Sequence, residues 1–564
     1  MRFYKFYRFF SLTLFAGILG SPNFAQEALK SAEEEYYDFL SLTGAAERPT
    51  LCYRTLSDSQ WKLTDETQNI WSKNNLGKKY TLYESDSKET NWFTAGIDRS
   101  IKLRLYGPEW FSSYNTKAPY GQNDGALWQG KGLNTSLTAG ARLEACGLEL
   151  TVKPQLTWSQ NKDFDIMPSN TDSEYGYFWG YGKNVGCDAP QRFGDSPFWT
   201  FDWGDTEIRW SWHTLTAGFG FQSPWLGPAW LNPMLGSNNA GTYPKFDAGL
   251  RKTEVRLPGT DWSLGNIEGR IWLGYLTESE YFDEDSTNNH RQLTGFSVSY
   301  SPSFFPELTF SVNKICLNRW DEKSIKYINP FYSTNDREDQ KASFGIDLLF
   351  PQAGFEVYGE LGIDDYNSRG FANPFHTAIY TVGAKKELSF FQKFDFFKKF
   401  SIRPELILEW NNFEMSQDFQ LQWRYMGYYS HSIISQGYTQ KGQIMGAGSG
   451  YFGNSQYLAL RTWFPKGNVT LFLHYNRPDT NYINNIAVES SSDEWNGRNP
   501  AQHEQWACYK AIRTYGIKAN FFVTKSLLIG TELNNSWIIN PRYFKLKSTS
   551  YRNTYLAFTA KYNL

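Results

Sequence analysis

Cysteine, charge of one sign and long apolar runs are all scarce in this sequence of 564 residues. Its five cysteines are odd in number and far apart, which fits neither a disulfide framework nor a zinc site and allows two disulfides at most. Beyond residue 25, no window approaches the roughly 20 apolar residues that a membrane-spanning helix needs, so a helical membrane protein is excluded. The cysteines are Cys52, Cys146, Cys187, Cys316 and Cys508.

The charge balance excludes further classes of protein. The chain holds 56 lysine and arginine residues against 58 aspartate and glutamate residues, so its net charge is only -2. A nucleic-acid binder needs a basic surface, and a disordered chain combines high net charge with few apolar residues. Neither description fits a chain that is 40% hydrophobic, and we therefore expect a folded protein that binds no nucleic acid.

Enzyme signatures are also missing. The sequence contains no nucleophile elbow, no HExxH motif, no P-loop and no CxxC pair, and its six histidines are scattered. Carboxylates such as Asp364 with Asp365, or Glu405 with Glu409, are compatible with glycoside hydrolysis, which needs two carboxyl groups about 5 to 10 Å apart. We interpret them instead as lumen charges that pair across strands, and we predict no catalysis, no cofactor and no metal site.

Aromatic residues, by contrast, are abundant. They make up 18% of the chain although its mean hydropathy is negative, so large rings stand among polar neighbours instead of in apolar runs. That mixture is typical of strands with one apolar and one polar face. No linker or low-complexity stretch divides the chain after about residue 100, which favours one large all-β domain.

The first 25 residues predict a secretory signal peptide. Arg2, Lys5 and Arg8 form a positively charged region, residues 10–20 form a short apolar core, and a small residue precedes Gln26. We expect the mature protein to begin at Gln26, with no lipid attached there.

Residues 26–92 predict a small periplasmic N-terminal helical segment. Residues 28–40 carry three consecutive glutamates, Glu33, Glu34 and Glu35, with apolar side chains at helix-compatible spacing. Such a charged helix either faces solvent or seals a lumen, and the sequence leaves both interpretations open.

Residues 93–564 predict a transmembrane outer-membrane β-barrel. Segments of roughly 8 to 14 residues alternate apolar and polar positions, as tilted strands do when one face meets lipid and the other a wet lumen. In the last strand, Leu556 and Phe558 fall on one face while Tyr555 and Lys561 fall on the other. About 18 antiparallel strands are expected, starting near residues 99, 133, 147, 206, 214, 249, 265, 292, 306, 341, 354, 376, 402, 455, 468, 512, 527 and 553.

The connections between these strands alternate in length. Those after even-numbered strands are short, such as Cys146-Gly147 and Pro351 to Ala353, while those after odd-numbered strands are long, such as 160–205 and 414–454. Outer-membrane barrels show this asymmetry, with short periplasmic turns and long outer loops. We therefore predict a barrel that spans the outer membrane and contacts its lipid. We also expect this barrel to be a monomer.

The long loops are rich in rings and planar polar groups. Sugars present flat C–H faces that stack on rings and hydroxyls that need polar partners, so this composition favours a carbohydrate binder. An aromatic girdle at the membrane interface explains single rings equally well. The predicted polysaccharide-stacking residues are Trp179, Trp199, Trp225, Trp230, Tyr428, Tyr429 and Tyr438.

Several stretches resemble the capsule-assembly Wzi family. Residues 218–244, GFGFQSPWLGPAWLNPMLGSNNAGTYP, look like its signature of a strand, a Trp-Gly-Pro loop and a small polar turn before a proline. Residues 356–384 and 405–450 resemble later blocks of the family in order and spacing. The early segments 36–62 and 119–132 also look like this group, so the resemblance covers most of the mature chain in patches.

The resemblance implies an outer-membrane barrel of about 18 strands with a periplasmic helical bundle. Such a protein acts as a lectin, without catalysis, that holds capsular polysaccharide at the cell surface and orders its assembly. The chain departs from the family at Leu226, where a second tryptophan is common, and at Ala229, where glycine is common.

Residue roles within the signature stay open at this stage. Trp225, Asn238 and Asn239 are candidate polysaccharide-binding residues, but each can equally fix the backbone of the loop. The predicted function is polysaccharide binding in capsule assembly or attachment. A diffusion channel is the alternative, because a barrel of this size encloses an aqueous lumen.

Overall fold

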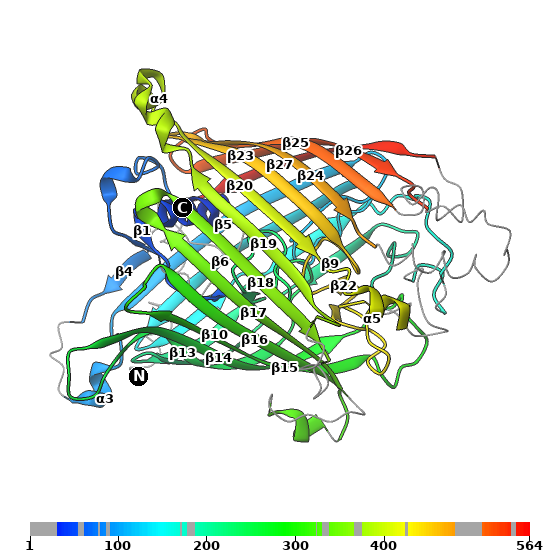
Figure 1. Cartoon of the computed structure of the whole chain (residues 1–564), viewed down its shortest axis with the longest axis horizontal. Coiled ribbons are helices and arrows are strands. Elements are labelled where there is room, and N and C mark those ends of the chain that lie inside the picture. The colour runs from blue at the N-terminus through cyan, green and yellow to red at the C-terminus, as the bar shows by residue number, and fades with distance from the viewer. Residues whose placement is uncertain are drawn as a thin grey trace, which may run out of the picture.

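The chain folds into a closed β-barrel of 18 antiparallel strands (Figure 1). In this computed structural model the last strand pairs with the first strand of the wall, which closes the sheet into a ring. The predicted fold class is confirmed. The structure describes residues 31–54, 61–76, 79–85, 91–169, 172–176, 187–322, 324–329, 338–365, 375–422, 427–479, 510–542 and 549–563.

Most strands of the wall are continuous. They are β5 (Ile101–Asn115), β6 (Gly132–Ala145), β11 (Leu215–Gly220), β13 (Lys245–Arg256), β14 (Ser263–Thr277), β15 (His290–Pro302), β16 (Leu308–Arg319), β17 (Glu338–Phe350), β18 (Phe355–Asp364), β19 (Ile379–Glu387), β20 (Arg403–Asn412), β23 (Asn454–Phe464), β24 (Gly467–Arg477), β25 (Ala511–Phe522), β26 (Leu527–Ile539) and β27 (Tyr551–Tyr562).

The third and fourth strands of the wall are each interrupted. The third consists of β7 (Leu148–Val152) and β8 (Gln155–Ser159), and the fourth of β9 (Phe198–Asp202) and β10 (Glu207–Trp212). Pro154 separates β7 from β8, and it cannot donate a hydrogen bond to a neighbouring strand. Each predicted strand start nevertheless lies within four residues of an observed strand of the wall.

One additional strand widens the sheet where the ring closes. β27 pairs with β5 only from Asn115 to Glu109, which leaves the beginning of β5 without that neighbour. The short strand β4 (Lys79–Tyr83) pairs there instead, with Lys79 opposite Arg104. The free edge of β5 is thereby covered, as sheet edges generally are in stable proteins.

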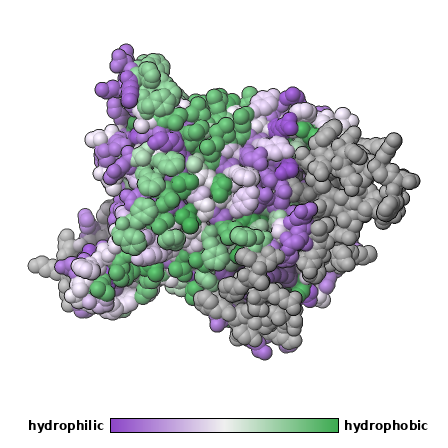
Figure 2. Space-filling view, viewed as in Figure 1, coloured by the Kyte–Doolittle hydropathy of each residue, from purple (hydrophilic) through white to green (hydrophobic). Residues whose placement is uncertain are grey.

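The two faces of the wall differ as the alternation predicts. On β27, Leu556, Phe558 and Tyr562 are exposed on the outside, whereas Tyr555 and Lys561 are buried inside. Figure 2 shows the outside as a hydrophobic band over the strands with hydrophilic residues toward both ends. An apolar band around a closed sheet is the surface that a membrane-spanning barrel presents to lipid.

The two ends of the barrel also differ, and we call them the turn end and the loop end. Short connections such as 146–147, 351–354 and 465–466 lie at the turn end, on the left of Figure 1, and long connections lie at the loop end. The connection 388–402 is the exception, because it lies at the turn end and contains η6 (Ser389–Lys393) and α4 (Asp395–Lys399).

The N-terminal segment enters the barrel instead of standing below it. In Figure 1 the dark-blue helix α2 (Ala32–Leu42) lies within the outline of the barrel at the turn end. Its Glu33, Glu34 and Glu35 are buried, so the solvent-facing interpretation of this helix is wrong. Further elements of the described segment are β1 (Ala46–Glu47), β2 (Tyr53–Arg54), β3 (Lys62–Leu63), η2 (Glu66–Gln68) and α3 (Trp92–Ala95).

Small elements complete the fold between the wall strands. No helix within the described ranges is both long and apolar enough to cross a membrane. Cys52, Cys146, Cys187 and Cys316 are free thiols, while Cys508 and the expected signal peptide lie outside the described residues. The remaining elements are β12 (Trp225–Leu226), η3 (Ser324–Tyr327), η4 (Pro351–Ala353), α5 (Gln417–Gln422), β21 (Thr439–Gln440) and β22 (Gln443–Ile444).

Candidate functional site

The helix α2 closes the turn end of the lumen with its acidic first turn. The Ser31 side chain caps the helix by accepting a hydrogen bond from the Glu34 N–H at 3.2 Å. Acidic residues are favourable there because the helix dipole is positive at its N-terminus. Glu35 forms an ion pair with Arg461 of the wall at 3.3 Å, so the same charge that suits the helix also binds it to the barrel.

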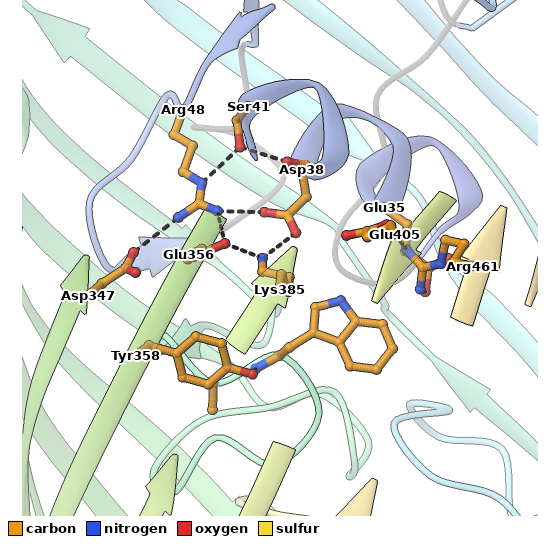
Figure 3. Close-up of polar contacts among 12 residues, drawn as sticks. Glu35, Asp38, Ser41, Arg48, Asp347, Glu356, Tyr358, Lys385, Glu405 and Arg461 are labelled. Atoms are coloured by element: carbon orange, nitrogen blue, oxygen red, sulfur yellow. Dashed lines mark hydrogen bonds and ion pairs between the residues drawn. The ribbon is translucent and has the colours of Figure 1, made fainter. Parts of the chain in front are cut away.

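A buried ion network fixes the rest of the segment to the wall (Figure 3). Arg48 binds Asp38 of α2 and Asp347 of β17, each at 3.0 Å, and Glu356 of β18 at 2.8 Å. Lys385 of β19 lies 2.6 Å from both Asp38 and Glu356. Burial disfavours the charged form of Asp38, but Lys385 and Arg48 outweigh burial and hold its pKa well below its usual value.

Aromatic packing seals the space beside this network. The ring of Tyr36 on α2 stacks on Trp71 with centroids 4.1 Å apart, and Trp71 meets Trp463 of β23 edge-on at 5.3 Å. The Trp71 indole N–H donates to the carbonyl oxygen of Phe464 at 2.9 Å. These contacts tie the segment to the turns themselves, so the turn end is closed by both charge and packing.

The N-terminal segment continues along the lumen toward the loop end. There it meets a loop that enters the lumen from the loop end. β2 and β12 form a two-stranded sheet inside the lumen, with Arg54 opposite Trp225. The Glu268 carboxylate accepts hydrogen bonds from the N–H groups of Leu51 at 2.7 Å and Cys52 at 2.9 Å. The lumen is therefore filled from both ends, and the two fillings touch near its middle.

The Trp-Gly-Pro loop has a structural role at this meeting point. Trp225 is only 1% exposed, and its indole N–H donates to the Ala229 carbonyl oxygen at 2.9 Å. Gly227 has φ +89 and donates its N–H to the Cys52 sulfur at 3.0 Å. A side chain at this position would be strained and would press on Glu360, so the motif fixes a backbone shape.

A single carboxylate holds the next part of that loop. Glu409 of β20 accepts hydrogen bonds from the N–H groups of Trp230 at 2.7 Å, Leu231 at 2.8 Å and Asn232 at 2.8 Å. The Tyr358 hydroxyl donates to the same carboxylate at 2.7 Å. Glu409 thus has structural partners, in agreement with its interpretation as a lumen charge.

Three of the predicted stacking rings belong to the core of the filling. Tyr428, Tyr429 and Tyr438 are buried. The Tyr429 hydroxyl donates to the Met234 carbonyl oxygen at 2.9 Å, and the Tyr438 hydroxyl donates to the Leu235 carbonyl oxygen at 2.5 Å. These rings fasten the descending loop to residues 427–453 and present no free surface to a ligand in this conformation.

Between the filling and the wall lies a cavity of about 470 Å³, which we call the chamber. Ser31 and Glu35 of the α2 region lie at its turn side, and residues 119–125 line it toward the loop end. Its wall comes mainly from β23 to β27, β5 and β6. The charged side chains that line the chamber are Glu35, Glu109, Asp124, Lys153, Asp205, Arg461, Lys518 and Glu532.

Rings stand among these polar groups. Trp230 stacks on Tyr457 with centroids 5.5 Å apart, and Tyr457 stacks on Phe472 at 5.9 Å. On another side of the chamber, Tyr120 packs against Tyr555 at 4.9 Å. A cavity of this size that combines apolar rings with convergent polar groups is typical of small-ligand sites.

A second cavity of about 220 Å³ adjoins the chamber, and we call it the mouth pocket. Both cavities share residues 119–124 as lining, while Pro190, Gln443 and Ile444 line only the mouth pocket. The shared segment is anchored by the Gly125 N–H, which donates to the Asn238 carbonyl oxygen at 2.7 Å. Because these lining residues come from loops, the mouth pocket lies at the loop end of the chamber.

The remaining predicted site residues fall into separate places. Trp230 and Asn238 line the chamber, and Asn239 lines the mouth pocket. The Asn239 side chain donates to the Ile444 carbonyl oxygen at 2.9 Å, so it also fixes backbone. Trp199 is 66% exposed on β9, and Trp179 lies outside the described residues.

Sequence reasoning missed Tyr120, Tyr457 and Tyr555 as chamber residues. Tyr457 and Tyr555 look like ordinary inward positions of alternating strands, and only the inserted loops turn those positions into a binding cavity. The stretch 119–132 did carry a signal, since it resembled a family block, but nothing in it indicated that it folds inward.

One cluster in the described residues has the composition of a metal site. Ligand atoms of Asp339, Asp365 and His431 lie within 4.8 Å of one another. The His431 Nδ1, however, accepts the N–H groups of Ile433 and Ile434 at 3.2 Å, and its Nε2 faces Asp365 at 2.9 Å. This arrangement places the imidazole proton on Nε2, which suits a hydrogen bond to Asp365 better than a metal bond.

Comparison with solved structures supports the fold. No protein-family model matches this chain, and no curated protein matches it. Among solved structures it is similar to Wzi of Escherichia coli, described as an outer-membrane protein involved in group 1 capsule assembly and a carbohydrate-binding β-barrel. The TM-score is 0.56 at 12% identity, and the match covers 96% of this chain and all of Wzi.

Weaker similarity extends to other outer-membrane barrels. OprB of Pseudomonas putida matches with a TM-score of 0.36 at 9% identity, covering 82% of this chain and 94% of that one. OccK2 of Pseudomonas aeruginosa gives the same TM-score and identity, with 82% and 98% covered. At such identities the comparison with Wzi establishes a shared fold, and function has to be argued from the site.

Proposed function

We propose that this protein is an outer-membrane lectin of the Wzi type that binds a surface polysaccharide at its loop end. In this proposal the turn end faces the periplasm and the loop end faces the outside, as in other outer-membrane barrels. The bound glycan is a capsular or related surface polysaccharide, which the protein holds during assembly or attachment. The similarity to the fold of a carbohydrate-binding barrel supports this proposal.

The observation that carries the proposal is the asymmetry of the filled lumen. At the turn end, α2, the Arg48 network and Trp71 fill the lumen with buried contacts. Toward the loop end, the chamber and the mouth pocket remain open volumes with polar and aromatic lining. Retention of a ligand presented from the loop side fits this arrangement better than passage from end to end.

The residues proposed to meet sugar are those that line the two cavities. Tyr120 and Trp230 supply rings, and Asn238 supplies an amide that both donates and accepts. The charged lining has five acidic and three basic side chains, so a neutral glycan suits the chamber better than a highly charged one. Trp225, Tyr428, Tyr429 and Tyr438 act indirectly, by holding the loops in place.

The test is binding of the purified, refolded protein to surface polysaccharide from its own source organism. Tyr120→Ala and Trp230→Ala are expected to weaken binding roughly three- to tenfold each, the usual worth of one ring contact. Trp199→Ala is the matched control, because it removes an exposed ring that lines neither cavity and should leave the affinity unchanged. Equal affinity for all three variants and the wild type would refute the cavity assignment.

A diffusion channel is the second candidate, favoured by the polar chamber inside a wall of 18 strands. Conductance across a planar bilayer separates the two functions. A lectin with a sealed turn end is expected to give no steady current in the wild type. Steady single-channel current together with absent polysaccharide binding would replace the lectin by a channel.

A further inference from the structure

The connection between β19 and β20 is unlike the other turns at its end of the barrel. It runs over residues 388–402 and contains two short helices, whereas the turn between β6 and β7 consists of residues 146–147. In Figure 1, α4 projects from the upper left corner, beyond the wall and away from the lumen. We call residues 388–402 the hairpin, and closing the sheet requires no connection of this length.

The hairpin has packing of its own. Its inner rings, Phe391 and Phe397, lie with centroids 4.7 Å apart. The Gln392 side-chain amide donates to the Ile402 carbonyl oxygen at 2.5 Å, and the Ile402 N–H donates to the Phe397 carbonyl oxygen at 2.9 Å. The hairpin is thus an ordered projection that presents a defined outer surface.

That outer surface is aromatic. Four phenylalanines, Phe390, Phe394, Phe396 and Phe400, are exposed by 50% to 61%. A cluster of exposed rings this dense marks a surface that another apolar phase covers. Figure 2 shows hydrophobic residues on the projection, and the hydrophobic band of the wall lies beside it.

The same surface is basic. Between residues 389 and 400 the hairpin carries Lys393, Lys398 and Lys399 against the single acid Asp395. None of these lysines forms an ion pair with a residue that the structure describes. The Lys399 ammonium lies over the Phe400 ring, 5.6 Å from its centroid. Aromatic rings mixed with exposed lysines characterise segments that lie at the surface of an anionic membrane.

Two other turns at the same end of the barrel indicate the level of the membrane surface. Phe304 on the turn after β15 is 87% exposed, and Trp262 on the turn after β13 is 75% exposed. Rings in this position form the girdle that barrels place at the interface. The hairpin therefore adds further exposed rings at the same end of the lipid-facing wall.

We propose that the hairpin lies in the headgroup layer of the leaflet at the turn end and binds anionic phospholipid. The outer phenylalanines enter the acyl boundary, and Lys393, Lys398 and Lys399 contact lipid phosphates. This site is independent of polysaccharide binding and lies at the opposite end of the barrel. Lipid bound there fixes the depth of the barrel in the membrane.

Fluorescence quenching in reconstituted vesicles tests the position of the hairpin. An environment-sensitive label is placed at Phe396→Cys in the full chain, with Cys146 and Cys508 replaced by serine. In vesicles containing phosphatidylglycerol, a nitroxide carried near the lipid headgroup should quench this label at least about twofold more than aqueous iodide does. Phe390→Cys provides a second label position if the first variant folds poorly.

The native Cys146, exposed in the turn 146–147, supplies the reference label with Phe396 intact. The label on the hairpin should be quenched more strongly by lipid nitroxide than the label at Cys146. Equal quenching at both positions, or a hairpin label that only iodide reaches, would overturn the proposal. The proposal would also be overturned if the hairpin label became protected from iodide only after periplasmic protein is added, because that result would indicate a protein partner.

The charge of the lipid is tested separately. Replacing Lys393, Lys398 and Lys399 by glutamine should lower the lipid quenching about twofold or more in phosphatidylglycerol vesicles and change it little in pure phosphatidylcholine. The matched control replaces Lys525 by glutamine, at the turn between β25 and β26. Identical quenching of wild type and triple variant in both lipids would remove the anionic headgroup from the proposal.

Discussion

The two halves of the lumen filling are built from different interactions. The half near the turn end, residues 31–54, is held by buried ion pairs, with Arg48 at their centre. The half near the loop end, residues 221–244, is held by backbone N–H groups on Glu409 and by buried rings such as Tyr429. Each half also contributes to a buried hydrophobic cluster, Phe39 beside Trp463 at the turn end and Met234 beside Tyr429 toward the loop end, so the halves differ in their polar contacts.

The difference reflects what each half has to do. Ion pairs with the wall resist displacement of a segment that comes from outside the barrel sequence, and they depend on both partners being present. Hydrogen bonds to backbone fix the shape of a loop in detail, and shape is what a binding cavity requires. Sealing and shaping are thus separate tasks in this barrel, and variants can separate them.

The largest expected effect comes from Arg48→Met. It leaves Asp38, Asp347 and Glu356 with only Lys385 as a buried counter-charge, a loss that typically costs about 3 to 5 kcal/mol. Hydrogen exchange of the α2 amides should increase strongly, and the bilayer conductance should rise, while exchange at residues 230–232, which Glu409 holds, changes little.

Arg256→Met is the matched control for that variant. Arg256 pairs with Glu254 at 2.9 Å, but both side chains are largely exposed, and such pairs contribute about 1 kcal/mol or less. An equal effect of both arginine variants on α2 exchange would mean that the buried network does not hold the segment.

Glu409→Gln should produce an effect of about 2 to 3 kcal/mol on the other half. The amide keeps one acceptor oxygen but loses the charge-assisted bonds to three N–H groups. Exchange should rise at residues 230–232 and polysaccharide binding should weaken, with α2 unaffected. Glu254→Gln, which changes an exposed carboxylate, should alter neither readout.

The smallest effect, a loss of roughly 2 kcal/mol of stability between pH 5 and pH 7, concerns the half near the turn end. Burial raises the pKa of Glu34 from its ordinary value of 4.5 to about 7, opposed by a hydrogen bond from the Trp61 indole. The folded state therefore keeps a proton that the unfolded state has lost. This contribution to stability is complete below pH 4.5 and disappears as the pH rises through about 7.

Exchange of the α2 amides should accordingly speed up between pH 5 and pH 7 beyond the intrinsic rate. Glu34→Gln should flatten this pH dependence, because an amide does not titrate. Glu66→Gln, an exposed glutamate of the same segment, should leave it unchanged. If the exchange rate of the α2 amides still rose with pH in Glu34→Gln, the pH dependence would belong to another group.

The wall was predictable from the sequence because alternation is a local property. Leu556 and Lys561 differ in face because of their spacing, and the membrane enforces that pattern on every strand. The interruption at Pro154 was visible as a proline, but nothing in the sequence shows that the ladder resumes with β8 and β9 on the far side.

The filling was predictable only in part, because its contacts join distant residues. Glu33 to Glu35 look like a solvated helix until Arg461 is placed beside them. Tyr428 and Tyr429 look like exposed loop rings, since a ring that folds a loop and a ring that binds sugar have the same composition. The alternation of the strands does not indicate that the loops 119–132 and 221–244 both fold into the lumen and contact each other there.

The position of α2 has a consequence for biogenesis. Residues 31–54 lie inside a ring that β27 closes against β5, so the first described residues are enclosed by the last strand. The wall must either assemble around this segment or receive it through an open end after closure. In either order, α2 gains its buried partners Lys385 and Arg461 only from strands that are made much later than the helix.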